Sequence, residues 1–265
     1  MSDTSAMSRD PNAVAGQVVI VTGGSKGVGR GIALHLAQQG ASVVITARRQ
    51  EALDEVSAEL DMLGAPHLAT TLNVADRDGA FALVEQTIAQ FGKVDALVAN
   101  AQTFRSVTPL AEITEHDMDV LLNTGPKGTL WGMQAVFPHM RDQGRGRIVT
   151  MGSNAALLGA AGYAPYASSK EAIRALTRSA AREWGKFGIT VNCLCPVSAA
   201  HRMPPSDEDP VRAKMFAETY ANQPIPRDGD AVDDIGPVVQ FLISDASRYM
   251  TGQTLMADGG AIMLI

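Results

Sequence analysis

The sequence has few cysteines and lacks any long apolar run. Only two of its 265 residues are cysteines, Cys193 and Cys195, and its five histidines are scattered along the chain. A metal site needs several ligands close together, so we expect no catalytic metal. Two residues spaced by two share one face of a strand, and we expect both thiols to be small buried side chains. A membrane-spanning helix needs about 20 apolar residues in succession, so no membrane partner is expected.

An excess of positive charge is also missing. The chain carries 22 lysines and arginines against 28 acidic residues, which gives a formal net charge of −6. Domains that bind nucleic acid usually present a basic stripe, so we expect no nucleic-acid partner. Residues 1–15 are polar and small, without the basic start and apolar segment of a signal peptide. We therefore expect them to form a mobile leader on a cytoplasmic protein.

Short β-branched runs alternate with helix-length segments along most of the chain. The runs are apolar on both faces, as in parallel strands that helices cover from both sides. This rhythm predicts an α/β fold with one doubly wound parallel sheet, and it places any ligand beyond the carboxyl ends of the strands. Since no linker divides the sequence, we expect residues 16–265 to form one domain. The expected strands are 18–21, 42–46, 68–72, 96–99, 147–150 and 190–194, and the first two helices are 27–39 and 50–63.

Residues 198–227 interrupt this rhythm with a proline-rich segment. Long irregular insertions in compact domains are often active-site lids, so we predict a substrate lid here, with a solvated surface loop as the alternative. Met203, Met215, Phe216 and Tyr220 would give the lid an apolar surface, which favours an apolar or alicyclic substrate. The same four side chains could equally be packing residues.

A glycine-rich loop, Thr22 to Gly29, follows the first expected strand and opens a helix. Glycines let the backbone turn tightly and approach a pyrophosphate, and the N–H groups at the helix start favour an anion. The position between a strand and a helix is the context that supports a dinucleotide site. The expected cofactor-binding residues in this loop are Gly23, Ser25, Lys26, Gly27, Val28 and Gly29.

The end of the second expected strand distinguishes between the two nicotinamide cofactors. NAD-binding chains usually place an acid there, about 20 residues after the loop, to hold the ribose hydroxyl. In this chain Arg48 and Arg49 follow the strand, and no acid occurs before Glu51. The planar guanidinium suits a phosphate, and Lys26 adds a further positive charge. We predict NADP(H), with the alternative that the two arginines only begin a solvated helix.

Tyr166 and Lys170 are four residues apart in a helix-length segment, so they share one helix face. A free tyrosine has a pKa of about 10 and is a poor base at neutral pH. A nearby ammonium favours the phenolate and is expected to lower that pKa. The pair is therefore a candidate proton shuttle for a hydroxyl or carbonyl group.

These motifs, in this order, resemble those of the short-chain dehydrogenase/reductase family, and the resemblance extends from about Gly16 to Gly260. The glycine-rich loop is similar to the TGxxxGxG element of the family, and the segment Tyr166 to Lys170 matches YxxxK. Ser153 lies thirteen residues before the tyrosine, where the family has its catalytic serine. Further segments that resemble family landmarks are 99–101, 188–192, 251–253 and 258–260.

The resemblance implies a Rossmann-like fold and a catalytic role for three side chains. Tyr166 would exchange a proton with the substrate oxygen while a hydride passes to or from the nicotinamide. Ser153 would hydrogen-bond that oxygen, Lys170 would bind the nicotinamide ribose, and Tyr166 would also contact the cofactor. The resemblance also implies a homotetramer, with helices around 118–140 and 166–184 at one interface and the apolar residues 261–265 buried against a partner. The further cofactor contacts it implies are Asn73, Val74, Asn100, Ala101 and Pro196.

The largest departure from the family pattern is Gly125, which stands where the family has a catalytic asparagine. That asparagine is thought to hold a water that links the lysine to solvent. Three alternatives remain open: an active site with water beside Gly125, substitution by Asn123 if the helix is irregular at Gly125 and Pro126, or impaired redox chemistry.

Four smaller departures concern Gln102, Val197, His201 and Asn73. Gln102 replaces the last glycine of the family's NNAG element, and Val197 replaces the glycine after Pro196. His201 replaces a threonine, and Asn73 replaces an aspartate but keeps hydrogen-bonding capacity. One hypothesis is that Gln102 and His201 shape an unusual substrate pocket, and the alternative is neutral drift.

The sequence thus predicts an NADP(H)-dependent oxidoreductase that interconverts a ketone and a secondary alcohol. Two alternatives remain: a catalytically weak NADP(H)-binding sensor or interaction protein, and a non-redox enzyme on the same scaffold. Direct hydride transfer to a substrate would separate the first interpretation from the other two.

Overall fold

The structure is a computed structural model that describes residues 10–104, 107–198 and 223–263. Residues 1–9, 105–106 and 264–265 and most of the predicted lid (199–222) lie outside the described part. His201 and the four apolar lid residues named above are therefore not among the described residues. None of the helices in the three described ranges is long and apolar enough to cross a membrane.

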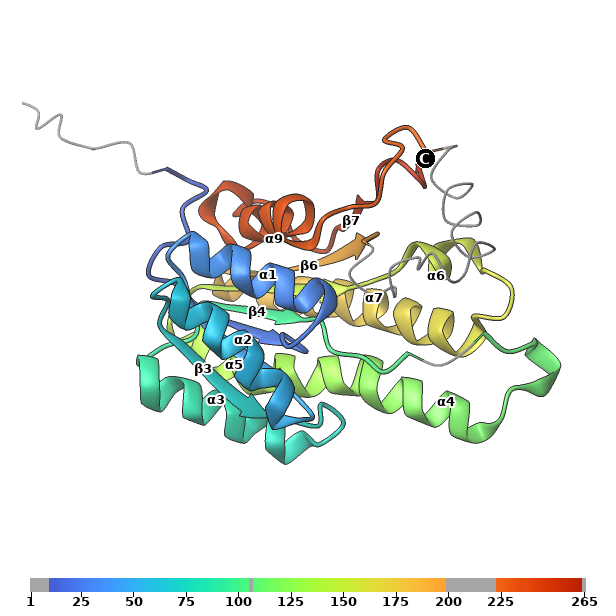
Figure 1. The fold of residues 1–265 in the computed structure, drawn as a ribbon, viewed down its shortest axis with the longest axis horizontal. Coiled ribbons are helices and arrows are strands. Elements are labelled where there is room, and N and C mark those ends of the chain that lie inside the picture. Colours follow the sequence, from blue (N-terminus) through green and yellow to red (C-terminus); the bar gives the residue numbers. More distant parts are fainter. Residues whose placement is uncertain (1–9, 105–106, 199–222, 264–265) are drawn as a thin grey trace, which may run out of the picture.

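The described residues form one sheet of seven parallel strands in the order β3-β2-β1-β4-β5-β6-β7 (Figure 1). The prediction of a doubly wound parallel sheet is confirmed. The strand order reverses direction between β1 and β4, and such a reversal opens a crevice at the carboxyl ends of the strands. The strands are β1 (Val18–Thr22), β2 (Ser42–Ala47), β3 (His67–Thr71), β4 (Ala96–Ala99), β5 (Gly146–Met151), β6 (Ile189–Pro196) and β7 (Thr254–Ala257).

Helices cover both faces of the sheet (Figure 1). The helices of one face are α1 (Gly27–Gln38), α2 (Gln50–Met62) and α9 (Gly236–Ile243), together with the π-helical turn Ala231–Ile235. The helices of the other face are α3 (Arg77–Phe91), α4 (Glu115–Leu122), α5 (Gly128–Asp142) and α7 (Ala164–Trp184). The short elements are α6 (Asn154–Leu158) and 3₁₀ turns at Leu110–Glu112, Gly185–Phe187 and Asp245–Ser247.

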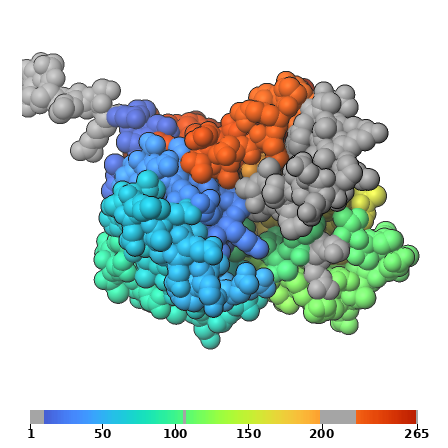
Figure 2. Space-filling view, in the orientation of Figure 1, coloured from blue at the N-terminus to red at the C-terminus, as the bar shows by residue number. Residues whose placement is uncertain are grey.

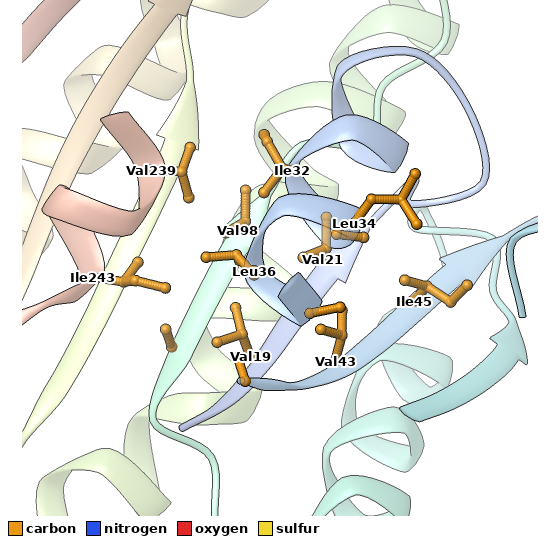
Figure 3. Packing of buried hydrophobic residues seen from close by; sticks show 14 of the residues in the cluster. Val19, Val21, Ile32, Leu34, Leu36, Val43, Ile45, Val98, Val239 and Ile243 are labelled. Atoms are coloured by element: carbon orange, nitrogen blue, oxygen red, sulfur yellow. The ribbon is translucent and has the colours of Figure 1, made fainter. Parts of the chain in front are cut away.

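Alternate residues of the central strands supply the two hydrophobic layers. Val19 and Val21 of β1 pack under α1, as Figure 3 shows, whereas Val18 and Ile20 belong to the opposite layer. All four are buried, because a central parallel strand has helices above and below it. The continuous apolar runs of the sequence follow from this double burial.

Strand β7 was not predicted, and its position explains why. It lies at one edge of the sheet, and all four of its residues are only partly buried. An edge strand has one neighbour, so its sequence, Thr-Leu-Met-Ala, need not carry the β-branched apolar pattern of a central strand. Its register is set by pairing with β6, for example Leu194 opposite Leu255.

The helical segment that contains Gly125 is irregular. Between α4 and α5 the chain forms a π-helical turn, Asn123–Lys127, with Pro126 inside it. Proline has no N–H to donate to the preceding turn, and the wider π-helical turn accommodates this loss. The sequence Gly125-Pro126 suggested an irregular helix at this point, and the π-helical turn is that irregularity.

Candidate active site

In the glycine-rich loop between β1 and α1, the glycines stand where a side chain would be strained or would clash. Gly23 and Gly27 have φ angles of 68° and 59°, a conformation that side chains disfavour. A Cβ added at Gly29 would lie 2.3 Å from the carbonyl oxygen of Gly23 and 2.4 Å from Asn100 Nδ2. The three glycines are thus required by the backbone and by close packing, as in a loop that lets a pyrophosphate approach.

Asn100, at the end of β4, fixes the shape of this loop. Its Nδ2 donates hydrogen bonds to the carbonyl oxygens of Thr22, at 2.9 Å, and Gly23, at 3.3 Å. In the other direction, the backbone N–H groups of Asn100 and Ala101 donate to Thr22 Oγ1 at 3.0 and 3.1 Å. The sequence placed Asn100 and Ala101 near the cofactor but did not reveal that they hold the loop.

The start of α1 offers N–H groups and positive charge to an anion. Lys26 is the N-cap residue, in extended conformation, and its side chain makes no capping hydrogen bond. The N–H groups of the first turn therefore have no side-chain partner from the N-cap and point, with the helix dipole, toward the loop. Ser25 is half-buried beside Lys26, and Val28 is buried in the core under the helix. The glycine cradle and the uncapped helix start fit a dinucleotide pyrophosphate.

Arg48 and Arg49 lie where a group attached to the adenosine ribose would be expected. Gly24 N–H donates to the carbonyl of Thr46 in β2 at 3.0 Å, so the end of β2 adjoins the glycine-rich loop. Both arginines are exposed, and neither forms an ion pair with any other described residue. Free guanidinium groups beside a pyrophosphate cradle suit a 2′-phosphate.

The other expected cofactor residues lie at the ends of β3 and β6. Asn73 is exposed, and its Oδ1 accepts a hydrogen bond from Ala75 N–H at 3.2 Å. Val74 is half-buried, and its carbonyl oxygen would lie 2.9 Å from a Cβ at Gly128. Pro196 ends β6 at the same edge of the parallel sheet. Topology thus places all the expected cofactor residues at the carboxyl ends of the strands.

Ser153, Tyr166 and Lys170 come together at this edge. Ser153 follows β5 and begins α6, while Tyr166 and Lys170 lie in the first turns of α7. Ser153 lies near Tyr166, where its hydroxyl acts on the pKa of the phenol. Lys170 Nζ lies 5.5 Å from the centroid of the Tyr166 ring and donates to the carbonyl oxygen of Met151 at 2.9 Å. Figure 1 shows α6 and the start of α7 on the side toward which the arrowhead of β6 points.

Burial governs the acid–base properties of this group. Burial raises the pKa of Tyr166 above its ordinary value of 10, and the neighbouring Ser153 hydroxyl acts in the opposite direction. Burial also lowers the pKa of Lys170 from 10.5 to about 8. The structure contradicts the prediction that Lys170 lowers the pKa of Tyr166, because removal of the phenol from water dominates. Tyr166 therefore keeps its proton at neutral pH.

The two cysteines of β6 lie near Lys170. Both are free and fully buried in β6, and a Cβ added at Gly152 would lie 2.8 Å from Cys193 Sγ and 2.6 Å from Cys195 Sγ. They share one face of the strand, which confirms the expectation of small buried side chains. Within the described ranges no group of three potential ligand residues could hold a metal ion.

Aromatic side chains surround Tyr166. Phe104 contacts its ring edge-on at 5.6 Å between centroids, and Tyr163 lies 6.1 Å from Phe104. Phe104 is 59% exposed despite its apolar ring. In Figure 2 the blue residues of the β1–α1 unit and the green residues of α4 and α5 meet in the middle of one face of the molecule.

The space beside Gly125 is taken by Gln102. A Cβ at position 125 would lie 2.7 Å from Gln102 Nε2, so the side chain of Gln102 fills the space that was considered for water. Asn123 does not take the place of the missing side chain, because its Oδ1 accepts a hydrogen bond from Lys127 Nζ at 2.8 Å on the exposed side of the turn. The sequence singled out Gln102 but gave no sign of this contact.

A parallel sheet that carries a glycine cradle, with a serine, a tyrosine and a lysine gathered at its carboxyl edge, defines a dinucleotide-dependent oxidoreductase. The family described as enoyl-(acyl carrier protein) reductase matches residues 8–261. The chain belongs to the short-chain dehydrogenase/reductase family, whose members use nicotinamide cofactors.

Three relatives illustrate this membership. A 12α-hydroxysteroid dehydrogenase of Clostridium sp. is 34% identical over 252 residues, which cover 92% of this chain and 96% of the relative. A 3-oxoacyl-(acyl-carrier-protein) reductase of Staphylococcus aureus is 36% identical over 245 residues, which cover 92% and 97%. The crystal structure of levodione reductase is 29% identical, covers 93% of this chain and 97% of its own, and superposes with a TM-score of 0.84.

Proposed function

We propose that this protein is an NADP(H)-dependent oxidoreductase that interconverts a ketone and a secondary alcohol. The observation that carries the proposal is the grouping of Ser153, Tyr166 and the buried Lys170 at the carboxyl edge of the sheet. The relatives named above, among them a hydroxysteroid dehydrogenase and a 3-oxoacyl reductase, support redox chemistry at hydroxyl and carbonyl groups.

Tyr166 is the proton donor of the reductive direction. Its raised pKa keeps the phenol protonated, so it can give a proton to a carbonyl oxygen as negative charge develops there. Ser153 lies near Tyr166 and supplies a second hydroxyl for the same oxygen. Lys170 has three N–H donors, and Met151 O is its one acceptor among the described residues, which leaves donors for a ribose hydroxyl.

NADP(H), when bound, supplies the hydride. The chain would hold its pyrophosphate with the glycine-rich loop and the start of α1, and its 2′-phosphate with Arg48 and Arg49. The absence of any ion pair between these arginines and other described residues supports the preference for the phosphorylated cofactor.

An apolar or alicyclic small molecule is the substrate class we infer. The exposed ring of Phe104 against Tyr166 supplies an apolar surface next to the proton donor, and Leu158 of α6 is 68% exposed. Exposed apolar side chains beside a reactive group are typical of ligand-binding surfaces. The hydroxysteroid relative, whose name denotes an alicyclic alcohol, is consistent with this class.

The experiment that tests the proposed function follows nicotinamide absorbance with NADPH or NADP⁺ against a panel of cyclic ketones and secondary alcohols. NADPH binding is measured in the same samples, and Tyr166→Phe is assayed alongside. Turnover that falls by about 10²-fold or more in the variant supports the role of Tyr166. Tight NADPH binding without turnover across the panel would instead favour a cofactor sensor or a non-redox enzyme.

We also propose a cytoplasmic homotetramer of single-domain subunits. The α4–α5 segment and α7 lie on the same face of the sheet, where Phe137 stacks on Trp184 with ring centroids 4.6 Å apart. At the end of the described chain Met263 is 73% exposed, which is consistent with burial against a partner. Light scattering behind a sizing column would distinguish a tetramer from smaller assemblies.

A further inference from the structure

Gly125 is a glycine because of its neighbours and not because of its backbone. Its φ angle is not positive, so other residues could adopt its conformation. A Cβ there, however, would lie 2.7 Å from Gln102 Nε2, 3.0 Å from Gln102 Cδ and 3.3 Å from Ser169 Oγ. The residue type at position 125 thus depends on the side chain at position 102, on a different element.

Hydrogen bonds fix the orientation of the Gln102 carboxamide. Ser169 Oγ donates to the carbonyl oxygen of Tyr166 at 2.9 Å and accepts from Gln102 Nε2 at 2.5 Å. Because the serine proton is already used, the amide nitrogen and not the amide oxygen must face Ser169. The adjacent Thr103 N–H donates to Thr124 Oγ1 at 3.2 Å, so two successive residues fasten the loop after β4 to its neighbours.

The oxygen of the same carboxamide is buried and has no hydrogen-bond partner among the described residues. An unpaired buried carbonyl is unfavourable, and in protein interiors an ordered water usually satisfies such a group. Ser169 is fully buried and directly precedes Lys170 in α7. Gln102 therefore presents a free acceptor within a network that ends at the backbone of Tyr166.

We propose that Gln102 is a positioning residue for the reaction. Its carboxamide fills the volume beside Gly125 and, through Ser169, holds the turn of α7 that carries Tyr166 and Lys170. Its Oε1 remains an acceptor for a water molecule. The kinetic part of this inference rests on the proposed redox function, whereas the packing part stands independently of it.

Thermal unfolding of four proteins tests the packing part: wild type, Gln102→Gly, Gly125→Asn and the double variant. In the wild-type background Gly125→Asn should lower Tm by about 4 °C or more, because the new side chain meets the carboxamide. In the Gln102→Gly background the same substitution should raise Tm, since it refills the emptied volume. Equal shifts in the two backgrounds would overturn the proposal.

Two further variants keep this comparison decisive. Gly132→Ala is the matched control, because a Cβ there meets only side-chain carbons of Leu97, the nearer at 3.4 Å. This substitution should change Tm by the same amount in both backgrounds. Gly125→Ala introduces only the Cβ that the carboxamide opposes, and it gives the same test if Gly125→Asn does not fold in the wild-type background.

Kinetics test the positioning part, at a temperature well below the lowest Tm of the set. Gln102→Gly should lower kcat by about 10-fold, because small displacements of reacting groups are costly, with KM for NADPH changed less than about twofold. Gln102→Met keeps the length of the side chain but removes its donor and acceptor, and it should lower kcat similarly. The double variant Gln102→Gly, Gly125→Asn should recover kcat.

Wild-type kcat in both Gln102→Gly and Gln102→Met would overturn the positioning role. If the wild type itself shows no turnover, the proposed function has failed, and the unfolding comparison still decides whether Gln102 and Gly125 depend on each other. The two failures are therefore distinguishable.

Discussion

The buried lysine of the candidate active site should make the stability of the protein depend on pH in a defined direction. Lys170 is 4% exposed, and burial lowers its pKa from 10.5 to about 8. The unfolded chain therefore binds more protons than the folded chain between these two values. Since stability rises with pH wherever the unfolded state binds more protons, Lys170 should destabilise the fold below about pH 8 and progressively less above it.

The size of this effect follows from the two pKa values of Lys170. The full difference between 10.5 and about 8 corresponds to about 3 kcal/mol of unfolding free energy. Between about pH 7 and about pH 9.5, Lys170 loses most of its charge in the folded protein but keeps it in the unfolded chain. The free energy of unfolding should therefore rise by about 2 kcal/mol over this range.

Urea unfolding of wild type and Lys170→Met at several pH values, at one protein concentration, measures the effect. The wild type should gain about 2 kcal/mol relative to the variant over that pH range. Lys186→Met is the matched control, because Lys186 is an exposed lysine just beyond α7 and its removal should leave a constant difference. A constant difference for Lys170→Met as well would refute the conclusion that Lys170 is desolvated.

Three further predictions concern the cofactor and the substrate oxygen. Arg48→Ala should weaken NADPH binding by about 10-fold or more and NADH binding little, and equal losses in titrations of both cofactors would exclude a 2′-phosphate contact. Gly29→Ala should abolish cofactor binding and lower Tm, because its Cβ would meet Gly23 O and Asn100 Nδ2; a calorimetric titration that matches wild type would contradict the close packing. Ser153→Ala should reduce kcat by about 10²-fold with cofactor affinity unchanged. A loss of NADPH affinity with kcat unchanged would contradict a role for Ser153 at the substrate oxygen.

The sequence was sufficient to predict the central part of the fold. Strands such as β1 and β5 lie between helices on both faces, so burial imposes an apolar run that can be recognised without a structure. Strand β7 lies at the edge, where this constraint is absent, and it was missed. The break between α4 and α5 was foreseeable because Pro126 cannot donate a backbone hydrogen bond.

The candidate site was predictable where one local segment sets the geometry. Tyr166 and Lys170 lie on one helix, so their spacing already makes them neighbours. The contact between Gln102 and Gly125 joins residues from two separate elements, and no local pattern encodes it. The pKa of Tyr166 was predicted in the wrong direction because its burial depends on tertiary packing that the motif does not reveal.

Transfer of deuterium from nicotinamide-labelled NADPH to a ketone, detected by mass spectrometry of the alcohol product, would test the proposed hydride transfer itself. We expect one deuterium on the carbinol carbon with the wild type and loss of labelled alcohol with Tyr166→Phe. Labelled product formed at the wild-type rate by Tyr166→Phe would contradict the role of Tyr166 as proton donor. Bound NADPH with no deuterium in any product would contradict the proposed redox function itself.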